Sequence, residues 1–159
     1  MDIYRILGAA LIALSGAQTV ILLNESAIKA VRSTEAAVLL LRELRSDIEC
    51  FMLPVSRALE RCSQELYHKL GYASESPPRT FSELVERGNI SDTETKRILS
   101  SLGDSLGLGY RDEQLSLCDG AIAQLEARRR QLSDQLPAKR RLNASLCMSG
   151  ALAAVILLL

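Results

Sequence analysis

The stretch LSLCDGAIAQLEARRRQLSDQL, residues 115–136, decides the fold of this chain. Its apolar residues recur at alternating spacings of three and four, interrupted once by Arg129, and they are Leu115, Cys118, Ile122, Leu125, Leu132 and Leu136. This heptad alternation is typical of a helix that packs one stripe against other helices. Because the repeat is short and a small domain needs the stripe for its own core, we favour a seam within one bundle over an intermolecular coiled coil.

The same helical period extends toward the N-terminus. Helices are predicted over Ile28–Ile48, Pro54–Leu70, Phe81–Arg87 and Asp92–Leu102. The two short helices begin with capping boxes, Thr80–Glu83 and Ser91–Glu94, in which the glutamate is placed to bond back to the cap. No stretch keeps the two-residue alternation of a strand, and aromatic residues make up only 4% of the chain. We therefore predict an all-α fold, an antiparallel helical bundle.

An apolar run without a charged residue lies at each end of the chain, ILGAALIALSGAQTVILL at 6–23 and LNASLCMSGALAAVILLL at 142–159. Each run has 18 residues, and such a helix is roughly 27 Å long, close to the thickness of a bilayer's hydrocarbon core. We therefore expect an N-terminal transmembrane anchor (1–23), a helical bundle domain (24–141) and a C-terminal transmembrane anchor (142–159).

Basic residues near the apolar runs lie almost entirely on the side of the central domain. Only Arg5 precedes the first run, and the basic residues on the inner side are Lys29, Arg32, Arg128, Arg129, Arg130, Lys139, Arg140 and Arg141. Because Lys and Arg beside membrane segments stay preferentially in the cytoplasm, we expect a cytoplasmic central domain. We interpret the triplets 128–130 and 139–141 as topology determinants, with contact to anionic lipid as the alternative.

A cleavable signal segment is the alternative to the first anchor. Ser15-Gly16-Ala17 fits a small-x-small cleavage rule, and Arg5 would serve as the positive flank. Against this, Asp2 accompanies Arg5, and the apolar run continues through residues 20–23 beyond the cleavage point. We favour an uncleaved anchor. Cleavage would instead produce an exported helical module, structural or sensory, held by its C-terminal anchor.

Composition and side-chain chemistry argue against several functions. Lys plus Arg and Asp plus Glu are each 19, so the chain is neutral and we expect no nucleic-acid partner. The four cysteines, at 50, 62, 118 and 147, lack CxxC spacing, and we interpret them as small buried apolar residues rather than a zinc site. They would form disulfides only if the domain lay outside the cytoplasm. The only histidine, His68, is expected to be solvated. We expect no catalytic site, cofactor, metal or small-molecule substrate.

The turn at Leu102–Arg111 is the best candidate for partner binding. Gly103, Gly107 and Gly109 mark a turn rather than a phosphate loop, because no Lys-Ser/Thr pair follows it. Loops held by a rigid bundle commonly carry contacts. The candidate partner-binding residues are Arg111, Asp112, Glu113 and Gln114. The alternative is a turn that only joins two helices. Because the helical stripes use most apolar residues, we expect a mainly polar binding surface.

Three segments resemble the stage III sporulation protein AB family of endospore-forming bacteria. RILGAALI at 5–12 resembles that family's KLLGA-type start, and LRSDIECFMLPVSRAL at 44–59 is similar to its L-x-x-E-I-x-Y-x-x-x-P-L-x-x-A-L segment. LGLGYRDEQ at 106–114 is similar to the L-G-x-S/H-D-x-x-x-Q turn into the family's last helix. Cys50 stands where the family usually has Tyr, and Gly109 and Tyr110 replace Ser/His and Asp. The order and spacing of the segments carry the resemblance.

The resemblance implies a scaffold. Members of that family look like the cytoplasmic helical domain of the F-type platform protein of type II secretion and type IV pilus machines. It implies a place in the mother-cell membrane facing the forespore, within a secretion-like channel complex. The implied partners are membrane lipid, other channel components and a secretion-type ATPase, the stage III sporulation protein AA. The expected function is therefore a non-catalytic membrane platform that docks this ATPase.

Overall fold

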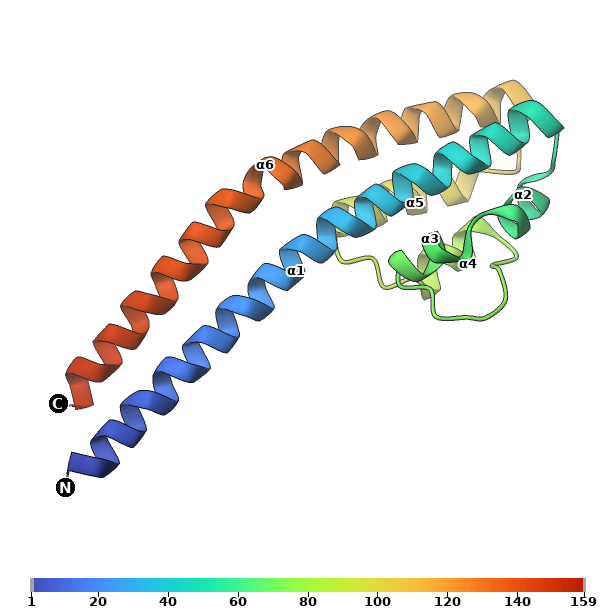
Figure 1. Ribbon diagram of the computed structural model, residues 1–159. Helices are drawn as coiled ribbons and strands as arrows, with labels where there is room; N and C mark the ends of the chain where they lie inside the picture. Colours follow the sequence, from blue (N-terminus) through green and yellow to red (C-terminus); the bar gives the residue numbers. More distant parts are fainter. Residues whose placement is uncertain (1, 159) are drawn as a thin grey trace. The chain divides into compact units, whose positions relative to one another are not determined.

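The structure is a computed structural model that describes the backbone of residues 2–158; the side chains of residues 2–7, 9–14, 16, 17, 151, 152 and 154–158 lie outside the described part. The helices are α1 (Asp2–Phe51), α2 (Val55–Arg61), α3 (Gln64–Lys69), α4 (Phe81–Arg87), α5 (Thr93–Ser105) and α6 (Arg111–Leu158) (Figure 1). The described residues contain no strand, so the all-α prediction is confirmed. The chain divides into two compact units, one formed by the residues up to Ile28 and from Ser133 onward, the other by Lys29–Leu132.

Helices α1 and α6 run antiparallel within the Lys29–Leu132 unit. Three ion pairs join them, Arg45–Asp119 at 2.6 Å, Arg42–Glu126 at 2.5 Å and Glu35–Arg129 at 3.5 Å. As the residue number falls on α1 it rises on α6, which is the register of an antiparallel pair. Leu40, Leu41 and Leu44 of α1 and Leu125 of α6 are fully buried. This stripe forms one side of the core.

The short helices supply the other side of the core. Helix α4 packs on α5 and also contacts α2. Their fully or almost fully buried side chains include Leu59, Leu84, Leu99 and, at the end of α3, Leu70. The cap predicted at Thr80 is present, since its hydroxyl accepts a hydrogen bond from the backbone N–H of Glu83 at 3.2 Å. The Glu83 carboxylate reaches back to the N–H of Arg79 at 2.9 Å, one residue before the cap.

The single helix predicted over 54–70 is wrong, because the chain breaks between α2 and α3. Cys62 adopts an extended conformation, with φ −60° and ψ 149°. The break frees backbone groups that other residues satisfy: the Glu43 carboxylate accepts from the Ser63 N–H at 3.2 Å, and the Tyr67 hydroxyl donates to the Leu59 carbonyl at 2.5 Å. Because both bonds depend on side chains distant in the sequence or buried in the core, the local period did not reveal the break.

The cap predicted at Ser91 is also wrong, by one residue. Asp92 is the N-cap of α5, and its carboxylate accepts from the backbone N–H of Thr95 at 2.9 Å. Serine and aspartate are about equally good caps, so local propensity does not choose between them. The choice of Asp92 follows from a tertiary ion pair described below.

The buried stripe of α6 is rotated from the predicted heptad. Cys118, Ala121, Leu125 and Leu132 are buried, whereas Leu115, Ile122 and Leu136 are only half-buried. Cys118, Leu125 and Leu132 belong to both stripes, so the change from Ile122 to Ala121 shifts the centre of the buried face by only part of the about 100° that separates successive helical residues. Arg128 and Arg129 are both half-buried beside this stripe, and Arg128 is the more buried, with a side chain 24% exposed against 42% for Arg129.

The two runs predicted as membrane anchors lie in α1 and α6, and half of their side chains lie outside the described part. Helix α6 continues through Pro137. Among the described residues, no helix combines the length and the apolar character needed to cross a membrane. Several large apolar side chains there are exposed by 48% to 72%, and they are Ile21, Leu22 and Leu23 on α1 and Leu142, Leu146 and Met148 on α6.

Candidate partner-binding surface

The chain turns sharply where α1 ends. Helix α1 stops at Phe51, and Met52 follows with φ +53°, in the left-handed region that crowds a β-carbon. Its side chain is 75% exposed. Pro54 then serves as the N-cap of α2. A backbone conformation of this kind costs of the order of 1–3 kcal/mol, and here it holds an apolar side chain in solvent.

The loop between α5 and α6 exposes two more large apolar side chains. Leu106 is buried and Gly107 has φ +94°, a conformation that glycine adopts without steric cost. Leu108 and Tyr110 follow, exposed by 84% and 90%. Gly107 faces Val55 at the start of α2, so this loop lies beside the turn that follows α1.

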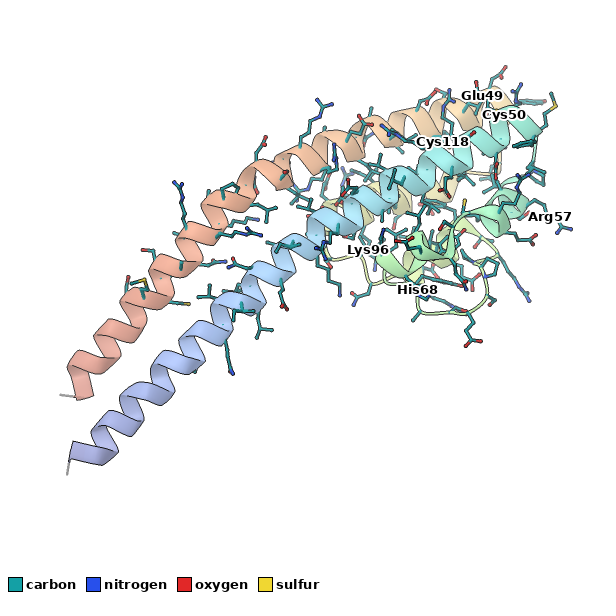
Figure 2. All side chains as sticks on the ribbon, in the orientation of Figure 1. Glu49, Cys50, Arg57, His68, Lys96 and Cys118 are labelled. Atoms are coloured by element: carbon teal, nitrogen blue, oxygen red, sulfur yellow. The ribbon has the colours of Figure 1, made fainter. Side chains whose placement is uncertain are left out.

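The four candidate residues predicted from the sequence take two different roles. Arg111 donates from Nη2 to the backbone carbonyl of Glu49 at 2.6 Å, which ties the start of α6 to the end of α1 (Figure 2 marks Glu49). Gln114 donates from Nε2 to the carbonyl of Gly109 at 2.8 Å. Asp112 and Glu113 are exposed in the first turn of α6. Arg111 and Gln114 therefore hold the turn, whereas the two acids are accessible to a partner.

We name Phe51, Met52, Leu108 and Tyr110 the tip surface. All four are at least 57% exposed, and they lie at one end of the Lys29–Leu132 unit. A cavity of about 380 Å³ beside them is lined by Ile48, Met52, Leu53, Pro54, Arg111 and Gln114. The Arg61 guanidinium stacks 4.6 Å above the Phe51 ring. The tip surface is apolar, whereas the sequence predicted a mainly polar binding surface, which stays a prediction. In the sequence, the tip surface could have been recognised from these apolar residues, which lie outside the helical stripes.

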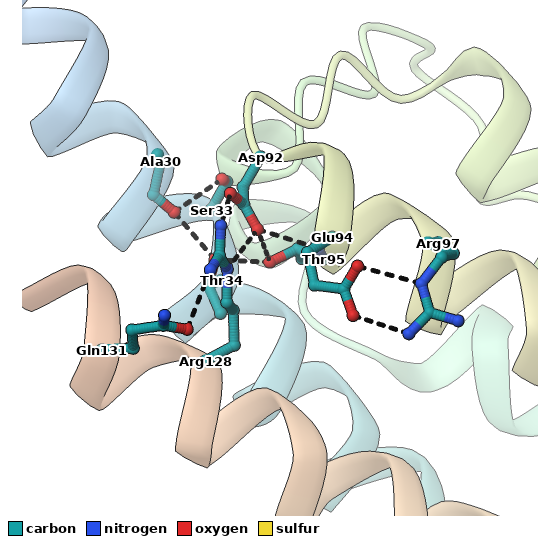
Figure 3. Close-up of polar contacts among 9 residues, drawn as sticks. All are labelled: Ala30, Ser33, Thr34, Asp92, Glu94, Thr95, Arg97, Arg128 and Gln131. Atoms are coloured by element: carbon teal, nitrogen blue, oxygen red, sulfur yellow. Dashed lines mark hydrogen bonds and ion pairs between the residues drawn. The ribbon is translucent and has the colours of Figure 1, made fainter.

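A buried polar cluster joins three helices elsewhere in the same unit (Figure 3). The Asp92 carboxylate accepts from Arg128 twice, at 2.7 Å from Nη2 and 3.0 Å from Nε. It also accepts from the Thr95 hydroxyl at 2.9 Å, and that hydroxyl lies 2.8 Å from the hydroxyl of Thr34 on α1. The guanidinium of Arg128, together with the Thr95 donors, lowers the pKa of Asp92 from 3.8 to about 2.

This cluster is suited to holding helices together rather than to proton transfer. Asp92 is 8% exposed and each of its carboxylate oxygens accepts a hydrogen bond. A carboxylate with so low a pKa is a weak base near neutral pH. The cluster therefore fixes α5 against α1 and α6. Sequence reasoning missed it, because it treated Arg128 as one of three equivalent topology determinants.

The cysteines and the histidine offer little reactivity inside the bundle. Cys62 and Cys118 are buried, as predicted, and burial raises their thiol pKa values to about 12 and about 11. Cys50 is exposed, so its predicted burial is wrong, and Cys147 is half-buried. His68 is exposed, as predicted. Within the described residues, no group of three or more His, Cys, Asp or Glu side chains is placed to hold a metal ion.

Comparison with known proteins addresses the resemblance seen in the three segments. The chain matches the family described as stage III sporulation protein AB over residues 5–159, almost its whole length. Neither the curated proteins nor the solved structures include a match. The family match covers all three segments, and it confirms the family that they predicted. The chain therefore belongs to the stage III sporulation protein AB family and is a sporulation-associated protein.

Proposed function

We propose that this protein is a non-catalytic membrane platform that docks a cytoplasmic secretion-type ATPase, the stage III sporulation protein AA, in a sporulation channel complex. The observation that carries the docking proposal is the tip surface. Its four large apolar side chains are 57% to 90% exposed. Single exposed apolar residues are ordinary, but a group of them at one end of a small unit is typical of a protein contact.

The described ends of the apolar runs support membrane anchoring. Ile21, Leu22 and Leu23 are consecutive on α1 and all are exposed. Because successive helical side chains point about 100° apart, they present apolar surface on three sides of the helix. A helix that is apolar all round is stable in lipid or in a protein core rather than in water. We therefore assign residues 6–23 and 142–159 to the mother-cell membrane, with residues 24–141 in the cytoplasm.

The titratable groups buried in the bundle support a structural rather than a catalytic role. Asp92 serves as a helix cap and ion-pair partner, and the buried thiols of Cys62 and Cys118 have raised pKa values. A catalytic base needs a pKa near the working pH, and a nucleophilic cysteine needs a lowered one. These groups instead stabilise the bundle that presents the tip surface.

Co-purification of the full-length protein with the co-expressed ATPase tests the docking proposal. We expect L108S/Y110S to weaken binding about 30-fold or more, because a central tyrosine anchor contributes about 2 kcal/mol or more to an interface. The fold should remain, since both side chains are exposed. The matched control is Leu39→Ser, which alters a 43% exposed leucine that lines a different cavity on α1. Unaltered binding by L108S/Y110S would contradict the docking proposal.

Charge reversal at Asp112 and Glu113 tests whether polar contacts, as well as apolar ones, contribute to binding of the ATPase. D112K/E113K should keep the fold, with a loss of about 1 kcal/mol because acids favour a helix N-terminus. We expect this variant to bind the ATPase more weakly. If both double variants bind as the parent does, the turn only connects two helices.

The orientation is tested with a Cys introduced at Ser76, an exposed loop position, in a Cys50→Ser background. We expect a membrane-impermeant thiol reagent to label it in permeabilised cells and not in intact cells. Labelling in intact cells would refute the cytoplasmic location. The mass of the mature protein provides a second measurement, because loss of residues 1–17 would instead favour the exported module.

A further inference from the structure

Two basic triplets on α6 look alike in the sequence and differ in the structure. Each arginine of the first triplet is in an ion pair: Arg128 with Asp92 at 2.7 Å, Arg129 with Glu35 at 3.5 Å and Arg130 with Glu126 at 4.0 Å. In the second triplet, Lys139, Arg140 and Arg141 are all exposed. None of these three is in an ion pair with another described residue. The protein neutralises the first triplet and leaves the second available.

The second triplet directly precedes exposed apolar surface. Its three consecutive side chains point about 100° apart, so their charges surround the helix. Leu142 and Leu146 follow and are 59% and 62% exposed. The nearest acid before the triplet on α6, Asp134, lies five residues before Lys139, more than one helical turn away. Long basic side chains beside apolar surface extend their charged heads toward the polar layer of a membrane.

We propose that Lys139, Arg140 and Arg141 form a binding surface for anionic phospholipid headgroups. This inference depends on the membrane anchoring proposed above and adds the class of lipid. Guanidinium groups donate paired hydrogen bonds to phosphate oxygens, and the lysine ammonium adds a compact positive charge. Each basic residue near an anionic membrane surface strengthens attachment about fivefold, equivalent to about 1 kcal/mol. Arg128–Arg130 have no part in it, because each of them is paired with a carboxylate of the bundle.

The test compares two double variants of the purified full-length protein reconstituted into phosphatidylcholine vesicles. R140Q/R141Q removes two charges from the proposed surface, and R129Q/R130Q removes the same charge from the paired triplet. The measurement is the association of spin-labelled phosphatidylglycerol relative to spin-labelled phosphatidylcholine, taken from the motionally restricted part of the spin-resonance spectrum. We expect the parent and R129Q/R130Q to prefer the anionic lipid. In R140Q/R141Q the ratio of phosphatidylglycerol association to phosphatidylcholine association should fall toward one, by up to about fivefold for each charge removed.

Two further measurements, lipid preference at high salt and vesicle flotation, separate the lipid preference from membrane anchoring. At about 1 M salt the Debye length is about 3 Å, so the preference of the parent should disappear. An equal preference in all three proteins, or no preference in the parent, would overturn the lipid inference. Flotation with phosphatidylcholine vesicles after carbonate washing measures anchoring separately. A parent protein that floats without a lipid preference refutes only this inference, whereas a protein that fails to float refutes the anchoring proposal as well.

Discussion

Replacing Asp92 with asparagine should isolate the contribution of one buried charge to the stability of the bundle. Asparagine is as good an N-cap as aspartate, so its side-chain oxygen can still accept from the Thr95 N–H. The variant removes the negative charge that faces Arg128 at 2.7 Å. Arg128 keeps a hydrogen bond to Gln131 at 2.9 Å, so its guanidinium retains one partner. The change is therefore the lost ion pair together with one of the two Arg128–Asp92 hydrogen bonds, because the NH2 group of asparagine cannot accept.

The shifted pKa of Asp92 sets the expected magnitude. Its value falls from 3.8 to about 2 in the folded chain, and one pKa unit corresponds to about 1.4 kcal/mol. The folded protein thus gains about 2 kcal/mol from the ionised carboxylate. Because folding lowers this pKa, the gain is complete above the ordinary value of 3.8 and disappears as the pH falls toward 2. We expect Asp92→Asn to lower the free energy of unfolding by about 2 kcal/mol at pH 7, and by progressively less below pH 4.

Urea unfolding of the 24–141 fragment, followed by circular dichroism between pH 7 and pH 3, measures this loss. The matched control is Glu94→Gln in the first turn of the same helix, which breaks the exposed pair with Arg97. Exposed pairs contribute little, so the control should lose under about 1 kcal/mol. An Asp92→Asn variant as stable as the parent at pH 7 would refute the reasoning. A loss of unfolding free energy of the same size at every pH would also refute it, because such a loss would not come from the charge of the Asp92 carboxylate.

The rotated stripe of α6 and the burial of the thiols lead to two further predictions. Leu125→Ala should cost about 3 kcal/mol because Leu125 is fully buried, whereas Ile122→Ala should cost about 1 kcal/mol because Ile122 is half-buried. Equal losses in urea unfolding would contradict the observed seam. In the folded protein, a maleimide should modify Cys50 rapidly and leave Cys62 and Cys118 unmodified until urea is added, as measured by peptide mass spectrometry. Equally fast modification of Cys62 and Cys50 would show that the core opens readily.

Local interactions in the sequence were enough to predict that the chain is helical and where several of its helices begin or end. The cap at Thr80 and the end of the helical stretch at Gly71, which has φ +77°, depend on residues within one turn of each other. The apolar period over residues 115–136 likewise predicted a helix that buries one stripe. The segments at 5–12, 44–59 and 106–114 further predicted the family, which the match over residues 5–159 confirms.

Tertiary contacts decided which residue of each pair of neighbours faces the core. Adjacent helical residues differ by about 100° in direction, and hydrophobicity alone favoured Ile122 over Ala121. In the structure, the buried Asp92 cap pairs with Arg128, whose side chain is 24% exposed, rather than with either of its two arginine neighbours. The arrangement of the tip surface was equally hidden, because Phe51 and Tyr110 are distant in the sequence and lie at one end only when Arg111 ties α6 to α1. Sequence periodicity describes one helix at a time, whereas the orientation of its face depends on the polar groups that its neighbours present.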